Sequence, residues 1–150
     1  MREVTGSTWT FQIMIIFIFI FSCFLMLSLS YSKVYTIKNR SLTIIEKYEG
    51  INTTSADLIN SFVLDKGYKT TGACETNWYG AVNLNGAYEK AKGNKSYYYC
   101  FREVKSANKK VYYEIKFFFK FNLPFIGDII TYSIKGETNA FRGSEDRITN

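Results

Sequence analysis

The sequence predicts an α+β protein. A long N-terminal transmembrane helix continues into an amphipathic helix, followed by a small domain with an antiparallel β-meander packed on helices. Two observations indicate this fold class. No charged residue occurs from Val4 to Ser32, and most of that stretch is apolar. Further along, every odd position from Val111 to Leu123 is apolar, which is the period of a strand with one buried face.

The apolar run Ile13–Tyr31 is long enough for a membrane span, because about 20 apolar residues cross a hydrocarbon core of about 30 Å. Lipid offers backbone amides no partner, so the run must be helical there. A cleaved signal peptide is the alternative, with Ser30 and Ser32 as the cut site. Its apolar region would cover only about 7–15 residues, so we expect an uncleaved single span.

We therefore divide the chain into an N-terminal tail (1–12), a transmembrane helix (13–32), an amphipathic extension (33–50), a small extracytoplasmic α+β domain (51–141) and a flexible C-terminal tail (142–150).

The span continues into the extension without a Gly or Pro before Gly50. Apolar or small residues recur there at helical spacing: Val34, Ile37, Ser41, Ile44 and Tyr48. We expect one helix from about Trp9 to Glu49, ended by Gly50.

A second helix is expected over residues 55–66, because Thr54–Asp57 (TSAD) fits a capping box. Gly67 ends it. The stretch that follows is read as short strands near Thr70–Cys74 and Trp78–Val82. Ala87–Lys92 (AYEKAK) is expected to form a turn of helix.

The C-terminal third predicts three antiparallel strands. Ser96–Val104 is rich in aromatic residues, and a polar turn at Ser106–Lys109 leads into Val111–Leu123. Pro124 and Gly127 interrupt the pattern, and Ile130, Tyr132 and Ile134 alternate in a last strand. We expect the helices to cover the face of odd positions and Glu114, Lys116 and Lys120 to lie on the opposite face.

The three cysteines differ in context. Cys23 lies in the apolar run, whereas Cys74 and Cys100 lie in the domain. A cysteine pair in a small extracytoplasmic domain typically forms a disulfide. Closing a loop of about 26 residues would stabilise the fold by roughly 3–4 kcal/mol.

No catalytic, cofactor or metal site is predicted, because histidine is absent and cysteine and serine have no base partner. We expect no enzyme activity and no small-molecule substrate. Stacking rings and cations do occur together, at Tyr97, Tyr98, Tyr99, Arg102, Lys105, Lys109 and Lys110. Alternate rings of a strand point into the core, so we expect no nucleic acid as partner.

The layout resembles that of type IV pilin-like proteins, most closely the TadE-like subunits of tight-adherence pilus systems in Gram-positive bacteria. The matching features are the apolar helix that runs into an amphipathic one, the short helix ending in Lys66-Gly67-Tyr68, and the close of the chain. In that close, Phe119–Gly127 (FKFNLPFIG) and Tyr132–Thr138 (YSIKGET) are similar to the family pattern F-x-F-x-L-P-x-I-G … I-x-G-E-T.

This resemblance implies a structural subunit whose apolar helix packs in a filament core or membrane platform. Its partners would be the lipid bilayer, other pilin-like subunits and platform proteins. Pilin precursors carry Gly before the cleavage site and Glu five residues after it. Gly6 is a candidate processing position here, but the fifth residue on is Phe11, so an unprocessed accessory subunit fits better.

The signals for orientation disagree. The chain carries a formal charge of +6, and several cations follow the span closely: Lys33, Lys38, Arg40 and Lys47. The positive-inside rule therefore favours a cytoplasmic domain. The cysteine pair and the resemblance favour the opposite side, and we expect a single-pass protein of the cell membrane with an extracytoplasmic domain. The alternative function is a membrane-tethered binding module for cell-wall polymer, DNA or a partner protein.

Overall fold

A computed structural model describes residues 2–105, 110–123 and 127–142. The fold is α+β, as predicted: a long apolar helix, a short helix and an antiparallel sheet domain. Its elements are α1 (Arg2–Lys47), α2 (Thr53–Asp65), β1 (Gly72–Ala73), β2 (Tyr79–Ala81), β3 (Tyr88–Lys90), β4 (Ser96–Tyr97), β5 (Tyr99–Lys105), β6 (Val111–Leu123) and β7 (Gly127–Glu137). The turn expected at 106–109, the break expected at Pro124 and the tail after Arg142 lie outside the described residues.

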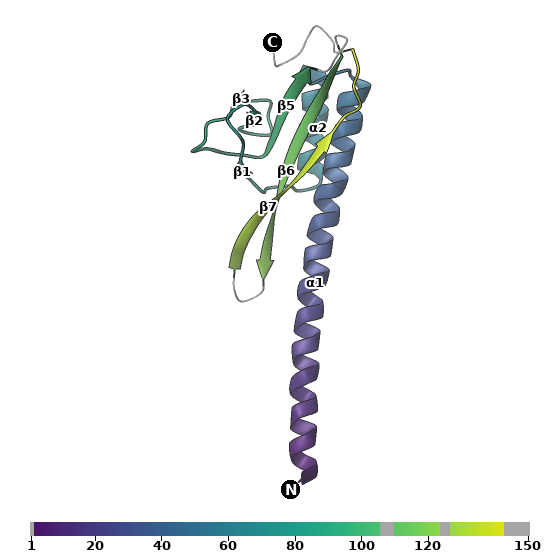
Figure 1. Ribbon diagram of the computed structural model, residues 1–150, viewed down its shortest axis with the longest axis vertical. Helices are drawn as coiled ribbons and strands as arrows, with labels where there is room; N and C mark the ends of the chain where they lie inside the picture. Colours follow the sequence, from purple (N-terminus) through teal and green to yellow (C-terminus); the bar gives the residue numbers. More distant parts are fainter. Residues whose placement is uncertain (1, 106–109, 124–126, 143–150) are drawn as a thin grey trace.

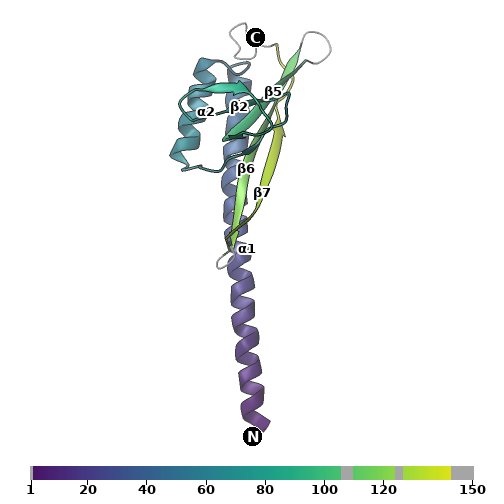
Figure 2. The same cartoon turned by 90° about the vertical axis from the view of Figure 1, so that its left-hand side faces the viewer.

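The main sheet has five strands in the order β3-β2-β5-β6-β7, and β1 and β4 form a separate two-stranded sheet. Strands β5, β6 and β7 pair antiparallel in sequence order, which confirms the predicted meander. The sheet lies against the C-terminal half of α1, while the N-terminal half of the helix projects away from the domain (Figures 1 and 2).

Helix α1 is one continuous element, as expected, but it begins at Arg2 rather than near Trp9. It ends at Lys47, and the chain turns through Glu49 and Gly50, whose φ angles are 50° and 141°. The Gly50 amide donates to the carbonyl of Ile45 at 3.0 Å. A positive φ in this turn is the role that glycine fills at a helix end.

Helix α2 is capped differently from the prediction. Its N-cap is Asn52, not Thr54: the Asn52 side-chain oxygen accepts from the Ser55 amide at 2.8 Å, and Ser55 Oγ accepts from the Asn52 amide at 2.9 Å. Asn and Thr compete for this role, and the residue with extended backbone takes it. Gly67, at φ 59°, ends the helix as expected.

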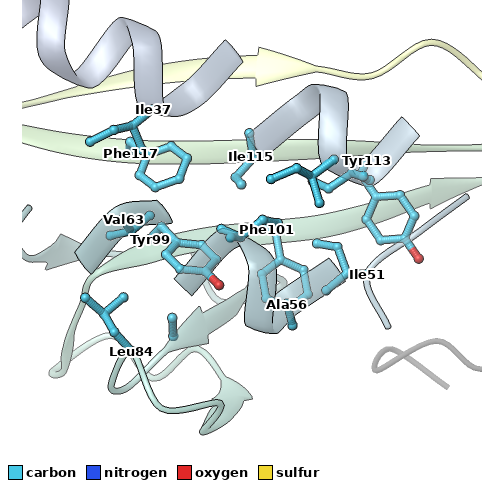
Figure 3. Packing of buried hydrophobic residues seen from close by; sticks show 14 of the residues in the cluster. Ile37, Ile51, Ala56, Val63, Leu84, Tyr99, Phe101, Tyr113, Ile115 and Phe117 are labelled. Atoms are coloured by element: carbon cyan, nitrogen blue, oxygen red, sulfur yellow. The ribbon is translucent and has the colours of Figure 1, made fainter. Parts of the chain in front are cut away.

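The larger hydrophobic core lies between the two helices and one face of the sheet (Figure 3). From β6 it receives Val111, Tyr113, Ile115 and Phe117, the first odd positions of the strand, all of them buried. From α1 it receives Val34, Ile37, Ile44 and Ile45. The predicted amphipathic spacing of the extension is therefore confirmed.

A second, smaller core covers the opposite face, where solvent-facing side chains were expected. It contains Cys74, Trp78, Ala91, Tyr97, Cys100 and Phe118. Phe118 is buried in this core, and Glu114 is buried beside Arg102. Glu114 therefore lies on the predicted face, but the expectation that this face is open to solvent is wrong. Period-two patterning identifies one buried face but cannot show that a later loop also covers the other.

Two local expectations are also wrong. Within Ala87–Lys92, where a helical turn was expected, Tyr88–Lys90 forms strand β3 because it pairs with β2; tertiary pairing overrides helix propensity here. The expected strand Ser96–Val104 is split at Tyr98, whose amide bonds to the carbonyl of Ala81 at 3.0 Å. The split places Tyr97 in the small core and Tyr99 in the large one.

Candidate functional site

The N-terminal half of α1 is a bare apolar surface. Between Thr8 and Lys33 all side chains are exposed except those of Cys23, Leu27 and Ser30, which are half-buried. No residue of the most apolar eighteen-residue window is buried, and the helix is long and apolar enough to cross a membrane. Phe17, for example, is 66% exposed. Each Å² of apolar surface removed from water stabilises the protein by about 25 cal/mol. Burial of this half of the helix against an apolar partner is therefore strongly favoured.

The sheet is attached to α1 at both ends of their contact. Near the apolar run, the ring of Tyr31 meets the ring of Phe119 edge-on at 6.1 Å. Near the helix C-terminus, the Glu46 carboxylate accepts from the Asn139 backbone amide at 2.8 Å and from its side-chain amide at 3.1 Å. The helix and the domain are thereby held in one orientation over several turns.

Lys33 connects this joint to α2. It is the first charged residue after the apolar run, and its Nζ donates to the carbonyl of Gly67 at 3.3 Å. That carbonyl lies two residues past Asp65, the last residue of α2, and so beside the helix end, where a cation is favoured.

Tyr68 extends the hydrogen bonding of β6 just before β5 begins at Tyr99. Its hydroxyl accepts from the Phe118 amide at 2.8 Å and lies 3.1 Å from the Tyr98 carbonyl and 2.7 Å from the Phe118 carbonyl, to which it can donate. Burial raises the pKa of the Tyr68 hydroxyl well above its ordinary value. The neutral hydroxyl substitutes for a strand neighbour that would otherwise pair with β6.

A second buried network joins α2 to the sheet. The Asn60 side chain donates to Tyr88 Oη at 2.7 Å and accepts from Tyr99 Oη at 2.9 Å, and the two hydroxyls are 2.9 Å apart. Burial raises the pKa of the Tyr88 hydroxyl and raises that of Tyr99 further. This closed network satisfies polar atoms in the core and has no open position for a substrate.

Cys74 and Cys100 are disulfide-bonded, as the sequence predicts, with their Cα atoms 5.8 Å apart. Both are buried in the small core. Cys23 is a free thiol on α1. The bridge fixes the loop after α2 to β5.

Charged groups surround Trp78 on the outer face of the sheet. Arg102 donates to both oxygens of Glu114, at 2.6 and 3.0 Å, and its guanidinium lies 5.0 Å from the centre of the Trp78 ring. Lys135 lies 5.4 Å from the same centre and donates to Glu75 at 3.1 Å. That hydrogen bond lowers the pKa of the Glu75 carboxyl. These charged groups are paired with each other, and together they cover the ring of Trp78, which is fully buried.

A groove of about 530 Å³ opens between α1 and α2. Its walls are formed by Arg40, Thr43, Ile44, Lys47, Tyr48, Leu58, Ser61, Phe62 and Asp65. Two cations face one carboxylate there, which makes the groove weakly positive.

The other described residues singled out in the sequence, Gly6 and the group of tyrosines and cations, do not form a site together. Gly6 lies within α1 and is exposed. Tyr97 and Tyr99 are buried in different cores, and Arg102 is paired with Glu114, so these side chains do not form an open stacking surface. Within the described part of the chain, no group of three or more Cys, Asp or Glu side chains could hold a metal ion.

Sequence reasoning missed the Tyr68 and Asn60 networks. For Tyr68 a signal existed, because a large residue directly after a C-terminal glycine often packs back on its helix. For Asn60, a polar residue on the buried face of a short helix, nothing local identified the two tyrosines that satisfy it. Comparisons with family models, with curated proteins and with solved structures gave no match.

Proposed function

We propose that this chain is a pilin-like structural or accessory subunit of a tight-adherence or type IV-like pilus or envelope secretion apparatus. Helix α1 anchors it in the cell membrane and its domain lies on the extracytoplasmic side. The observation that carries the proposal is the division of α1. One unbroken helix is apolar and mostly exposed before Lys33 and enters the core from Val34 onward.

This division supports a subunit role because the bare half presents apolar side chains in every direction around the helix. The four successive residues Ile15–Ile18 are each more than half exposed, although consecutive side chains point about 100° apart around the helix. Lipid can surround such a helix, and other helices can replace the lipid through close packing. The same surface thus serves an isolated anchor and an assembled bundle.

The extracytoplasmic side is supported by the disulfide, since disulfides persist in oxidising compartments. Because Cys74 and Cys100 are buried and bonded, the test needs an exposed reporter. We expect Lys105→Cys in a Cys23→Ala background to react with a membrane-impermeant maleimide in intact cells. Reaction only after lysis would place the domain in the cytoplasm and contradict the proposal.

Processing distinguishes an accessory subunit from a cleaved pilin. Residue Phe11 stands five positions after Gly6, where the family pattern has Glu, so we expect the N-terminus to remain intact. Mass measurement of the protein extracted from membranes checks this. A product that begins at Ser7 would instead indicate cleavage by a prepilin peptidase.

A membrane-tethered binding module is the second candidate, and the groove between α1 and α2 is the observation that favours it. Purification of the detergent-solubilised chain with its partners separates the two functions. Co-purification of a secretion-type ATPase and a polytopic platform protein is expected for the pilus subunit. An anionic polymer without those proteins, lost on Arg40→Ala and Lys47→Ala, would support the binding module.

A further inference from the structure

The β6–β7 hairpin runs back along α1 toward the helix N-terminus (Figures 1 and 2). Contacts at successive heights establish the direction. Asn139 bonds to Glu46, and a Cβ built at Gly136 would lie 2.8 Å from Leu42 Cδ1. Nearer the N-terminus of α1, the ring of Phe119 contacts the ring of Tyr31.

The spacing of these contacts follows the two backbone geometries. Gly136 pairs with Ile115, and from Ile115 to Phe119 a strand advances about 13 Å at about 3.3 Å per residue. That length equals about nine helical residues. Gly136 faces both Lys38 and Leu42, so its contact centres near residue 40, nine residues from Tyr31. Strand β6 continues to Leu123, another 13 Å or so. The hairpin therefore extends to about the level of Cys23.

The burial of α1 marks the same path independently. Cys23, Leu27 and Ser30 follow one another on one face of the helix, and in the bare half they alone among the described side chains are half-buried. The lowest of them, Cys23, lies at the level that the strand geometry gives for the end of the hairpin. This part of the hairpin thus lies beside the apolar run.

Exposed aromatic residues indicate where the membrane begins. Tyr31, Tyr35 and Tyr132 are 46%, 44% and 45% exposed, and Tyr132 stacks on Phe119 at 5.4 Å, at the level of Tyr31. Trp9, 69% exposed, stands at the other end. Trp9 and Tyr31 are about 33 Å apart along the helix, close to the thickness of a hydrocarbon core, and such rings favour the two interfaces.

We propose that the end of this hairpin, residues 120–123 and 127–130, enters the leaflet that faces the domain, past the level of Tyr31, and is a second membrane contact beside α1. The inference rests on the proposed membrane anchoring. The partner is the lipid surface, because the end of the hairpin carries Phe121, Leu123, Ile129 and Ile130 and lies beyond the tyrosine level. Cys23 is about 12 Å past Tyr31 along the helix. Because Lys120, Asp128 and the backbone edges of a two-stranded hairpin require polar partners, we expect headgroups and water to follow the hairpin and to thin the leaflet around it.

The test uses the full chain with Cys23→Ala, so that one added cysteine can carry a nitroxide label while the disulfide remains. The label is placed at Leu123→Cys, with Phe17→Cys in the apolar run and Lys105→Cys at the far end of β5 as controls. The protein is reconstituted in phosphatidylcholine vesicles containing some phosphatidylglycerol. Oxygen concentrates in lipid and a nickel chelate stays in water, so the ratio of their collision rates reports depth.

We expect the ratio at Leu123 to exceed that at Lys105 several-fold and to stay below that at Phe17. A ratio equal to that at Lys105 would place the hairpin in water and overturn the inference while the anchor stands. Shielding from both reagents would mean contact with protein, such as a second copy, and would overturn it as well. If the label at Phe17 also lies in water, the membrane anchor itself is wrong and the hairpin contact with it. Ile130→Cys on the facing strand repeats the test if Leu123→Cys does not fold.

Discussion

Truncation of Phe117 to alanine is the most direct test of how the sheet packs on the helices. Its side chain is fully buried, with ring centres 5.2 Å from Tyr99 and 5.8 Å from Tyr68, and it lies beside Ile37 (Figure 3). The lost transfer energy is about 2–3 kcal/mol, and a partly collapsed cavity adds about 1–2 kcal/mol. We expect the free energy of unfolding to fall by about 3–5 kcal/mol, the usual range for a buried Phe.

The assay is urea unfolding of a fragment of residues 33–150, followed by fluorescence. The fragment keeps every core residue of the described structure, the first of which is Val34, and it leaves Trp78 as its single tryptophan. Lys120→Ala, at an exposed position of the same strand, is the matched control and should cost less than about 0.5 kcal/mol. Equal small losses from both variants would refute the packing of this face against the helices.

Three other changes test separate contacts. Tyr68→Phe removes the acceptor of the buried Phe118 amide and should cost about 1–3 kcal/mol in the same unfolding assay; no loss would show that the hydroxyl does not complete the ladder. Cys100→Ser should lower the free energy of unfolding by about 2–4 kcal/mol and leave Cys74 reactive to a thiol reagent, whereas two free thiols in the unreduced native protein would reject the bridge. Alkaline titration is the third: since the pKa values of Tyr68, Tyr88 and Tyr99 are raised on folding, the unfolded chain loses its protons first, so stability should be unaffected by these groups below about pH 10 and fall above it. If all tyrosines ionise near the unperturbed tyrosine pKa of about 10 while the protein stays folded, as followed by phenolate absorbance, this prediction is wrong.

The sequence predicted those features that a local pattern determines. The charge-free run and the helical spacing after it specify α1, because both are properties of neighbouring residues along one helix. Alternation from Val111 onward specifies β6, and glycine marks the end of α2 because Gly67 adopts a positive φ. The disulfide followed from the pair of cysteines in the domain and from the extracytoplasmic side expected for it, with no geometry needed.

What the sequence left open depends on contacts between distant segments. Tyr88–Lys90 becomes a strand only because β2 offers it a partner. Phe118 is at an even position of β6 and so lies on the face away from the helices. It is buried there by residues between 74 and 100, which no pattern within the strand reveals. Glu114 was expected on an open face, yet it is buried against Arg102. None of these partners lies within a turn of the residue that it affects, so local patterning cannot reveal them.

The continuity of α1 also separates the two candidate functions. A tethered binding module gains from a flexible linker, which lets the domain search for its ligand away from the membrane. Here the helix passes from the apolar run at Ser32 into the core at Val34 without a turn. Contacts at Tyr31 and Glu46 then fix the sheet on the helix. Any tilt or rotation of the span therefore moves the domain as one body. Such rigidity favours a subunit whose neighbours must meet it in one orientation, and a flexible insertion after Ser32 should abolish assembly while leaving the domain folded.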